Sequence, residues 1–329
     1  MPGAQERILR RRINSVKATK KITRAMELIA ASRVVRAQQR ANAARPYARQ
    51  ITKVIEDLAA GGANVDHPLL REVESLGKIA YVILSSDRGL AGAYNSSVIR
   101  AAERELQANQ LEGVDYELIT IGRKAEAYFR FRNYRVEAAF EGISDKPTYE
   151  NAREIAELIT AKFEHGGVDK VILAFTEFVS LATQKVVVRT FLPLAPAEKI
   201  AQAGSAEAVS AYEFEPSPEA VLADLLPRYV EARLFAALLD AAASEHANRQ
   251  RAMKSATDNA DDMIVRLGRQ LNRARQDAIT TEIMEIISGA EGLKEDQGDE
   301  EDLLLDRLDA PHLFPRHEED RRHSPPGHV

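Results

Sequence analysis

The chain has 329 residues, no cysteine and a formal net charge of −5 at pH 7. That length is sufficient for one or two domains with a buried core. The lack of cysteine excludes disulfides and thiolate metal sites, and no apolar run approaches the roughly 18 residues of a membrane span. No signal peptide or import presequence is recognised, so we expect synthesis in the cytoplasm without export or direct membrane insertion.

Residues 8–58 are predicted to form one long helix. They contain no Gly and a single Pro, Pro46, and are rich in the helix formers Ala, Arg, Lys and Gln. Small and apolar residues recur at alternating steps of four and three, a heptad pattern that indicates packing against a second helix. Alanine in the middle of this pattern predicts closely spaced helix axes, and Pro46 predicts a kink or a break near Arg45. The positions are Ala37, Ala41, Ala44, Ala48, Ile51, Ile55 and Leu58, and we expect Ile22, Met26 and Ile29 to continue them upstream.

The same stretch is strongly basic. Residues 1–55 hold 14 Lys and Arg but only two acids, Glu6 and Glu27, which gives a net charge of +12. A charge imbalance of this size indicates a negatively charged partner, whether nucleic acid, a membrane surface or an acidic protein.

The middle of the chain alternates between strand and helix patterns, which predicts a mainly parallel sheet. We expect Thr148 to cap one of its helices and Gly166-Gly167 to end that helix. The expected strands are 78–86, 116–121, 134–140, 170–178 and 184–192, and the expected helices are 96–109, 124–131 and 148–165.

A second long helix is predicted from Glu219 to about Ser288, ended by Gly289 and Gly292. We expect its buried face to include Ala252, Ala256, Met263, Leu267, Leu271, Ile279, Ile283 and Ile286. The predicted fold is therefore an α/β insert within a long antiparallel two-helix coiled coil, formed by the N- and C-terminal helices and followed by a disordered acidic C-terminal tail. The expected domains are an N-terminal coiled-coil helix (1–60), a Rossmann-like α/β domain with a loop (61–218), a C-terminal coiled-coil helix (219–292) and a tail rich in acids, His and Pro (293–329).

No motif indicates a catalytic, cofactor or metal site. The segment DRGLAGAYN (87–95) follows a predicted strand and contains Gly89 and Gly92, but it matches neither phosphate-binding glycine motif, so a tight turn is the favoured interpretation. The four His of the tail have spacings that fit no standard metal motif. Two functional alternatives stay open: a nucleic-acid-binding coiled coil that uses the basic helix, and a nucleotide-binding enzyme in the insert.

Five segments in one order resemble the gamma subunit of rotary ATP synthases. They are NSVKATKKITRAMELIAASR (14–33), RPYA (45–48), SSDRGLAGAYN (85–95), SEHANRQRAMKSATDNA (244–260) and NRARQDAITTEIMEIISGA (272–290). The resemblance covers residues 1–292; the tail has no counterpart in it.

The resemblance implies a non-catalytic, cofactor-free rotor shaft of an F-type, proton-translocating ATP synthase. Its partners would be three alpha and three beta subunits, an epsilon subunit and the membrane c-ring, on the cytoplasmic side of a bacterial membrane. No nucleic acid would be involved. By motif match, the residues that contact the beta subunits would be Lys20, Lys21, Arg24 and Met26 of the first helix and Arg249, Gln276, Thr280 and Glu282 of the second.

Overall fold

The computed structural model describes residues 2–60, 67–71, 73, 75–194, 215 and 217–295. The chain divides into two compact units, residues 13–266 and a smaller unit of residues 1–12 with 267–329. The predicted helix end at Gly61-Gly62, most of the loop within 193–218 and the predicted disordered tail beyond Glu295 lie outside the described residues. None of the described helices is long and apolar enough to span a membrane.

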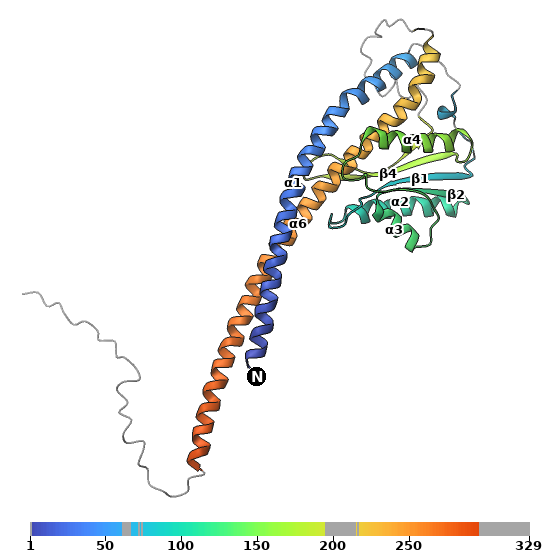
Figure 1. Cartoon of the computed structure of the whole chain (residues 1–329). Coiled ribbons are helices and arrows are strands. Elements are labelled where there is room, and N and C mark those ends of the chain that lie inside the picture. Colours follow the sequence, from blue (N-terminus) through green and yellow to red (C-terminus); the bar gives the residue numbers. More distant parts are fainter. Residues whose placement is uncertain are drawn as a thin grey trace, which may run out of the picture. The chain divides into compact units, whose positions relative to one another are not determined.

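Two long helices enclose the α/β part in the sequence, as predicted (Figure 1). The predicted strands and short helices are confirmed with boundaries that differ by a few residues. The elements are α1 (Pro2–Ala60), η1 (Pro68–Leu70), β1 (Lys78–Leu84), α2 (Tyr94–Leu111), β2 (Asp115–Ile121), α3 (Arg123–Phe131), β3 (Val136–Phe140), α4 (Tyr149–Glu164), β4 (Lys170–Phe178), β5 (Gln184–Leu192) and α6 (Pro218–Glu295).

The predicted end of α6 at Gly289 or Gly292 is wrong, and of the two outcomes predicted near Arg45 in α1, a kink or a break, the break does not occur. Helix α6 does not end at Gly289 or Gly292 but continues to Glu295; a single glycine costs only about 1 kcal/mol relative to alanine, which good helix formers around it can offset. Helix α1 passes through Pro46 without a break. Its ribbon bends in its second half in Figure 1, where a proline that lacks a backbone donor is expected to bend a helix.

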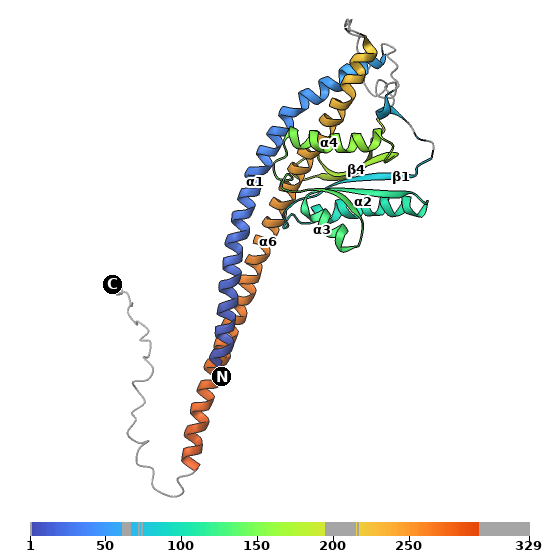
Figure 2. The same cartoon turned by 45° about the vertical axis from the view of Figure 1, so that its right-hand side comes forward.

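Within residues 13–266, α1 and α6 pack side by side in opposite directions (Figures 1 and 2), and this part of the two helices is called the helix pair. The Thr23 hydroxyl meets the Thr257 hydroxyl at 2.9 Å in a buried position. Three residues earlier on α1, Lys20 pairs with Asp261, four residues later on α6. Further along, Val34 and Ala37 share a buried cluster with residues 243 and 247 of α6. The pairing therefore keeps one antiparallel register over more than four turns of helix.

The buried face of α1 corrects part of the predicted seam. Ile22 and Ile29 are 61% and 54% exposed, so the upstream continuation through them is wrong. The heptad defined by Ala37 to Leu58 instead continues through Val34, Ala30, Glu27 and Thr23, all of which are buried. Glu27 and Thr23 are polar, so a search of the sequence for apolar residues misses them. On α6 the same error occurs: Leu267 is buried, but Met263, Ile279, Ile283 and Ile286 are exposed.

The five strands form one sheet in the order β3-β2-β1-β4-β5. All neighbours are parallel except β4 and β5, which are antiparallel, so the prediction of a mainly parallel sheet is confirmed. Helices α2 and α3 cover one face and α4 covers the other (Figure 1). Helix α4 begins as predicted, with the Thr148 hydroxyl accepting a hydrogen bond from the Asn151 N–H.

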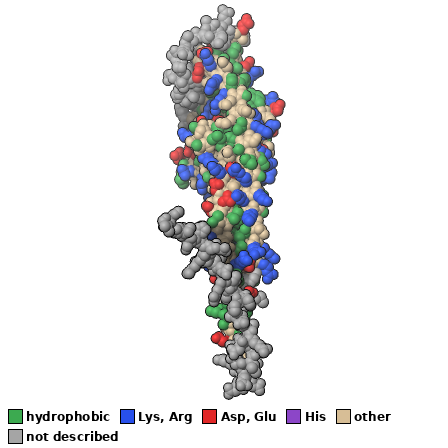
Figure 3. Space-filling model, turned by 90° about the vertical axis from the view of Figure 1, so that its left-hand side faces the viewer, with side chains coloured by type: hydrophobic (Ala, Val, Ile, Leu, Met, Phe, Trp, Pro, Cys, Tyr) green, Lys and Arg blue, Asp and Glu red, His purple; other side chains and the backbone are tan. Residues whose placement is uncertain are grey.

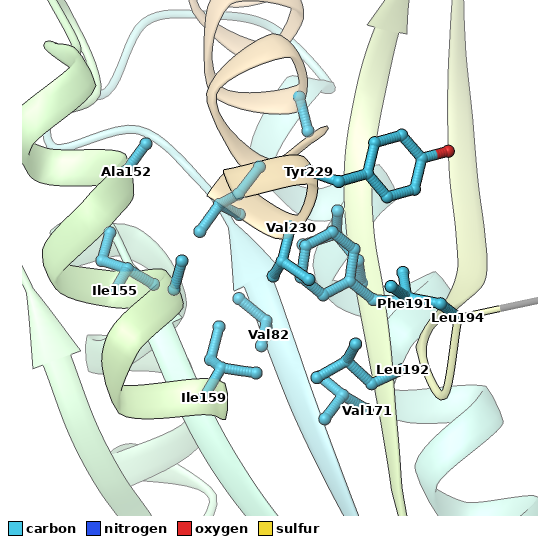
Figure 4. Packing of buried hydrophobic residues seen from close by; sticks show 14 of the residues in the cluster. Val82, Ala152, Ile155, Ile159, Val171, Phe191, Leu192, Leu194, Tyr229 and Val230 are labelled. Carbon is cyan, nitrogen blue, oxygen red and sulfur yellow. The ribbon is translucent and has the colours of Figure 1, made fainter. Parts of the chain in front are cut away.

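The largest buried cluster joins the sheet to the helix pair. Figure 4 shows Val82 of β1 beside Ile155 and Ile159 of α4, with Val230 of α6 close to it in the same cluster. Ile55 of α1 belongs to the same cluster and is fully buried. Burial of a large aliphatic side chain contributes about 1.5–3 kcal/mol, so this shared core holds the α/β part firmly against both long helices.

The alanine stretch of α1 differs from the expectation of close packing. Ala41 is 8% exposed, but Ala44 and Ala48 are only partly buried. A cavity of about 250 Å³ lies beside these three alanines and the facing residues of α4 and α6. Small side chains therefore leave space here that neither long helix fills.

Candidate subunit interface

Two of the predicted contact residues on α1 have partners within the chain. Lys20 binds Asp261 of α6, and the Arg24 guanidinium donates to both carboxylate oxygens of Glu27 at 2.9 Å. The Arg24 side chain remains 57% exposed, and Lys21 is exposed as well. Exposed pairs of this kind contribute about 0–1 kcal/mol. These cations therefore remain available to an acidic partner.

Apolar side chains are exposed next to these cations. Ile22, Leu28, Ile29 and Val35 of α1 are all more than half exposed, and the predicted contact residue Met26 is partly buried. Figure 3 shows Lys and Arg side chains (blue) spread over the face on which α1 lies, with hydrophobic patches (green) between them. This surface combines positive charge with apolar area, which suits a partner that has both acidic and apolar groups.

The predicted contact residues near the C-terminal end of α6 are exposed in the smaller unit. Gln276, Thr280 and Glu282 are exposed, and the Thr280 hydroxyl donates to the Gln276 carbonyl at 3.0 Å, an ordinary contact within a helix. Every described side chain from 279 to 293 is exposed. In the smaller unit, this end of α6 therefore exposes side chains on all sides.

Arg249 is placed differently from the other predicted contact residues, because it is buried, with 8% of its surface exposed. Its guanidinium forms an ion pair with Glu245 at 2.8 Å, and Glu245 is almost completely buried. It also faces the carbonyl oxygens of Arg88 and Gly89 at 3.4 and 3.3 Å, in the turn between β1 and α2. The structure thus gives Arg249 partners within its own chain, and its predicted contact with a beta subunit stays a prediction.

A second ion pair lies beside the first. The Arg33 guanidinium of α1 donates to both oxygens of Asp145 at 2.6 and 2.7 Å. The His246 ring of α6 lies 3.3 Å from the same carboxylate. These groups, together with Glu245, Arg249 and the carbonyls of Arg88 and Gly89, are called the clamp. The clamp connects α1, α6 and two loops of the α/β part. All its members except Asp145 lie in the motif segments 14–33, 85–95 and 244–260, but no sequence pattern indicated that they meet.

Burial controls the ionisation of the clamp. Burial lowers the pKa of His246 to about 4, despite the opposing effect of Asp145, so the ring is neutral near pH 7. Burial also raises the pKa of Glu245, and the Arg249 guanidinium counteracts this. One carboxylate oxygen of Glu245 has no hydrogen-bond partner within the described part of the chain. Arg249 is therefore the main group that compensates a buried negative charge.

Three clamp residues could in principle hold a cation. Ligand atoms of Asp145, Glu245 and His246 lie within 4.8 Å of one another. However, Arg33 and Arg249 already pair with the two carboxylates, and a metal ion would have to displace or lie close to both guanidinium groups. The arrangement is better suited to neutralising charge within the fold than to binding a metal.

The turn at 87–95 is held by its own chain. The Asp87 carboxylate accepts hydrogen bonds from the N–H groups of Arg123 and Ser144 at 3.2 Å. Burial raises the pKa of Asp87, but these bonds, together with others from Gly142 and the Ser144 hydroxyl, outweigh burial and lower the pKa. Gly92 has a positive φ of 57°, and a Cβ there would lie 3.5 Å from the Cβ of Ala252. The turn therefore packs directly against α6, which agrees with the prediction of a tight turn.

Comparison with known proteins agrees with this architecture. A family model described as ATP synthase matches residues 5–293. The ATP synthase gamma chain of Frankia casuarinae is 51% identical over 295 residues, which cover 88% of this chain and 98% of that one. The gamma chain of Streptomyces coelicolor is 48% identical, with coverages of 88% and 97%.

Solved structures show the same fold at low sequence identity. A rotor chain of the Euglena gracilis mitochondrial ATP synthase matches with a TM-score of 0.61 and 16% identity, covering 84% of this chain and 99% of that one. A chain from the central stalk and c-ring of the Tetrahymena thermophila enzyme matches with a TM-score of 0.54 and 24% identity, covering 71% and 99%. The chain therefore belongs to the family of ATP synthase gamma chains, the non-catalytic subunits that form the rotor of the central stalk.

Proposed function

We propose that this chain rotates inside a ring of three alpha and three beta subunits and is attached through its α/β part to an epsilon subunit and a membrane c-ring, on the cytoplasmic side of a bacterial cell membrane. Proton flow through the c-ring would turn the shaft, and the shaft would drive ATP synthesis at the beta subunits. The bacterial relatives, which match along almost their whole length, support this role.

The observation that carries the proposal is the fixed antiparallel register of the helix pair. The contacts of Thr23 with Thr257 and of Lys20 with Asp261 place one turn of α1 against one turn of α6 without slippage. A rotor must transmit torque, which requires that its two helices do not slide past each other. The polar contacts specify the register that apolar seams leave less well defined.

The clamp supports the same role at the junction with the α/β part. Arg33 binds a loop of the α/β part from α1, and Arg249 binds another loop from α6. Torque applied to the α/β part would therefore reach both long helices. In this proposal Arg249 acts within the rotor, and the surface contacts with the beta subunits fall to Lys20, Lys21, Arg24 and Met26 and to Gln276, Thr280 and Glu282.

The test uses a subcomplex assembled from this chain with the alpha and beta subunits of its own organism. Co-purification in a ratio of three alpha and three beta to one chain tests assembly, and the rotation of a bead attached to the α/β part during ATP hydrolysis tests function. A ring that forms but shows no rotation of this chain would refute the rotor proposal.

Charge reversal tests the contact surface. We expect Lys20→Glu, Lys21→Glu and Arg24→Glu combined to slow rotation at low salt, because acidic loops of the beta subunits would then be repelled. The matched control reverses three exposed cations of the α/β part, Arg100, Arg104 and Lys124. In a subcomplex without epsilon and c-ring, this control variant should rotate normally. Equal rotation of both variants would show that the α1 cations do not guide the shaft.

A further inference from the structure

The cavity beside the alanine stretch has the features of a ligand site that the rotor function does not require. It measures about 250 Å³ and lies between α1, α4 and α6, all within residues 13–266. A cavity of about 150 Å³ is large enough to bind benzene in a protein core. This one therefore has room for a phenyl-sized group and a short side arm. Its lining consists of Ala41, Ala44, Arg45, Tyr47, Ala48, Tyr149, Ala232, Phe235, Ala236, Leu239 and Asp240.

Aromatic rings form one wall of the cavity. The Tyr149 ring meets the Tyr47 ring edge to face at 6.5 Å between centroids and meets the Phe235 ring at 5.6 Å. The Tyr149 hydroxyl donates to Glu231 at 2.6 Å, which fixes the position of the ring. The wall is thus formed before any ligand binds, and aromatic faces attract cations.

Asp240 is the only acidic residue among those that line the cavity. Within the described residues its carboxylate takes part in no hydrogen bond and no ion pair. Burial raises its pKa to about 6; the charge of Arg45 lowers it, that of Glu177 raises it and that of Arg189 lowers it. A partly buried carboxylate without a bonded partner is destabilising unless a cation or donor compensates it.

We propose that this cavity binds a small organic ammonium ion, whose apolar group occupies the alanine-lined space and whose N–H groups donate to the Asp240 carboxylate. The apolar lining supplies the burial energy, and the charge-assisted hydrogen bond supplies the selectivity for a cation. This inference is independent of the rotor function, because the site needs only the helix pair and α4.

A variant of Arg45 tests the sign of the charge on the bound ligand. Arg45 lines the cavity but is exposed to solvent, and its positive charge opposes the entry of a cation. Arg45→Gln should therefore strengthen the binding of an ammonium ion and leave a neutral ligand unaffected. An anionic ligand would respond in the opposite direction.

The experiment compares two probes of equal shape, phenethylamine and 2-phenylethanol, by calorimetric titration of the full chain. We expect the amine to bind about tenfold more tightly than the alcohol, in line with a charge-assisted bond. Asp240→Asn should reduce the difference to less than about threefold. Ala44→Leu should weaken both probes at least about tenfold by filling the cavity, and the control Ala43→Leu, at an exposed position of α1 outside the cavity lining, should change neither.

The pH dependence separates Asp240 from its neighbours. Protonation of Asp240 below about pH 6 should weaken the amine and leave the alcohol unchanged, and Asp240→Asn should abolish this dependence. If the dependence persists in Asp240→Asn, the group that titrates is another, such as Glu177, and the assignment is wrong. Failure of both probes to bind, or equal binding of both to the native chain and the Asp240→Asn variant, would overturn the proposal. Circular dichroism of each variant establishes that it is folded.

Discussion

Removal of the Arg249 side chain tests the claim that it compensates a buried charge. Glu245 is 2% exposed in the native chain; in Arg249→Ala its carboxylate loses the ion pair at 2.8 Å, and the carbonyls of Arg88 and Gly89 lose a donor. Breaking a buried pair by deleting one partner costs about 3–5 kcal/mol. The contacts with the two carbonyls are long, so we expect a loss near the lower limit, about 3 kcal/mol.

Thermal unfolding of the full chain, followed by circular dichroism, measures this loss. A loss of 1 kcal/mol lowers the unfolding temperature of a domain of this size by about 2–4 °C, so the midpoint temperature should fall by roughly 6–12 °C. The control Lys254→Ala removes an exposed cation from the same helix and should change stability by less than about 0.5 kcal/mol. The double variant Glu245→Gln with Arg249→Met should recover part of the loss, because it removes the buried charge together with its partner.

The pH dependence supplies a second criterion. Burial raises the pKa of Glu245 in the folded state, and Arg249 partly offsets this. Without Arg249 the folded state binds the Glu245 proton more tightly than the unfolded state does, so the variant regains stability relative to the native chain as the pH falls through the raised pKa of the folded state toward the ordinary value of 4.5. The reasoning is refuted if Arg249→Ala is as stable as Lys254→Ala, or if the double variant is no more stable than Arg249→Ala.

Three further predictions concern residues 13–266. Gly122→Ala should lower the free energy of unfolding in urea by more than about 3 kcal/mol, because φ is +90° and the new Cβ would lie 2.2 Å from the Ser85 carbonyl oxygen. The control Gly113→Ala, with φ +86° and open space around it, should cost only about 1–2 kcal/mol. Thr23→Val with Thr257→Val should change the unfolding free energy by less than about 1 kcal/mol, because both partners of the buried hydroxyl pair become apolar together; a much larger loss would show that the pair stabilises the helices. His246 has a pKa of about 4 in the folded state against 6.5 in the unfolded state, so its contribution to stability is complete above about pH 6.5. Up to about 3 kcal/mol of this contribution is lost as the pH falls toward 4. His246→Gln should flatten this part of a plot of unfolding free energy against pH, and an unchanged slope would contradict the assignment.

The order and type of the elements followed from local patterns. Short β-rich runs predicted the strands at 78–86, which the structure shortens to 78–84, and at 170–178, and Thr148 predicted the start of α4, because such features depend on residues close together in the chain. The heptad from Ala37 to Leu58 identified the buried face of α1, since side chains at steps of four and three lie on one side of any helix. The motif order identified the family without reference to the fold.

Other features depended on which residues the fold brings together. The seam continues through Thr23 because α6 presents the Thr257 hydroxyl there, whereas Ile22 and Ile29 lie outside the buried face of the same helix. The clamp joins residues more than 100 positions apart, and a separation of that size leaves no periodic trace in the sequence. Asp240 looks like any polar residue of an amphipathic helix until the alanines of α1 and the rings of α4 and α6 enclose it. Local preference and motif order were therefore enough to identify the helices, the strands and the family, whereas the charges that are buried and paired could be found only in the folded chain, because pairing depends on contacts across the fold.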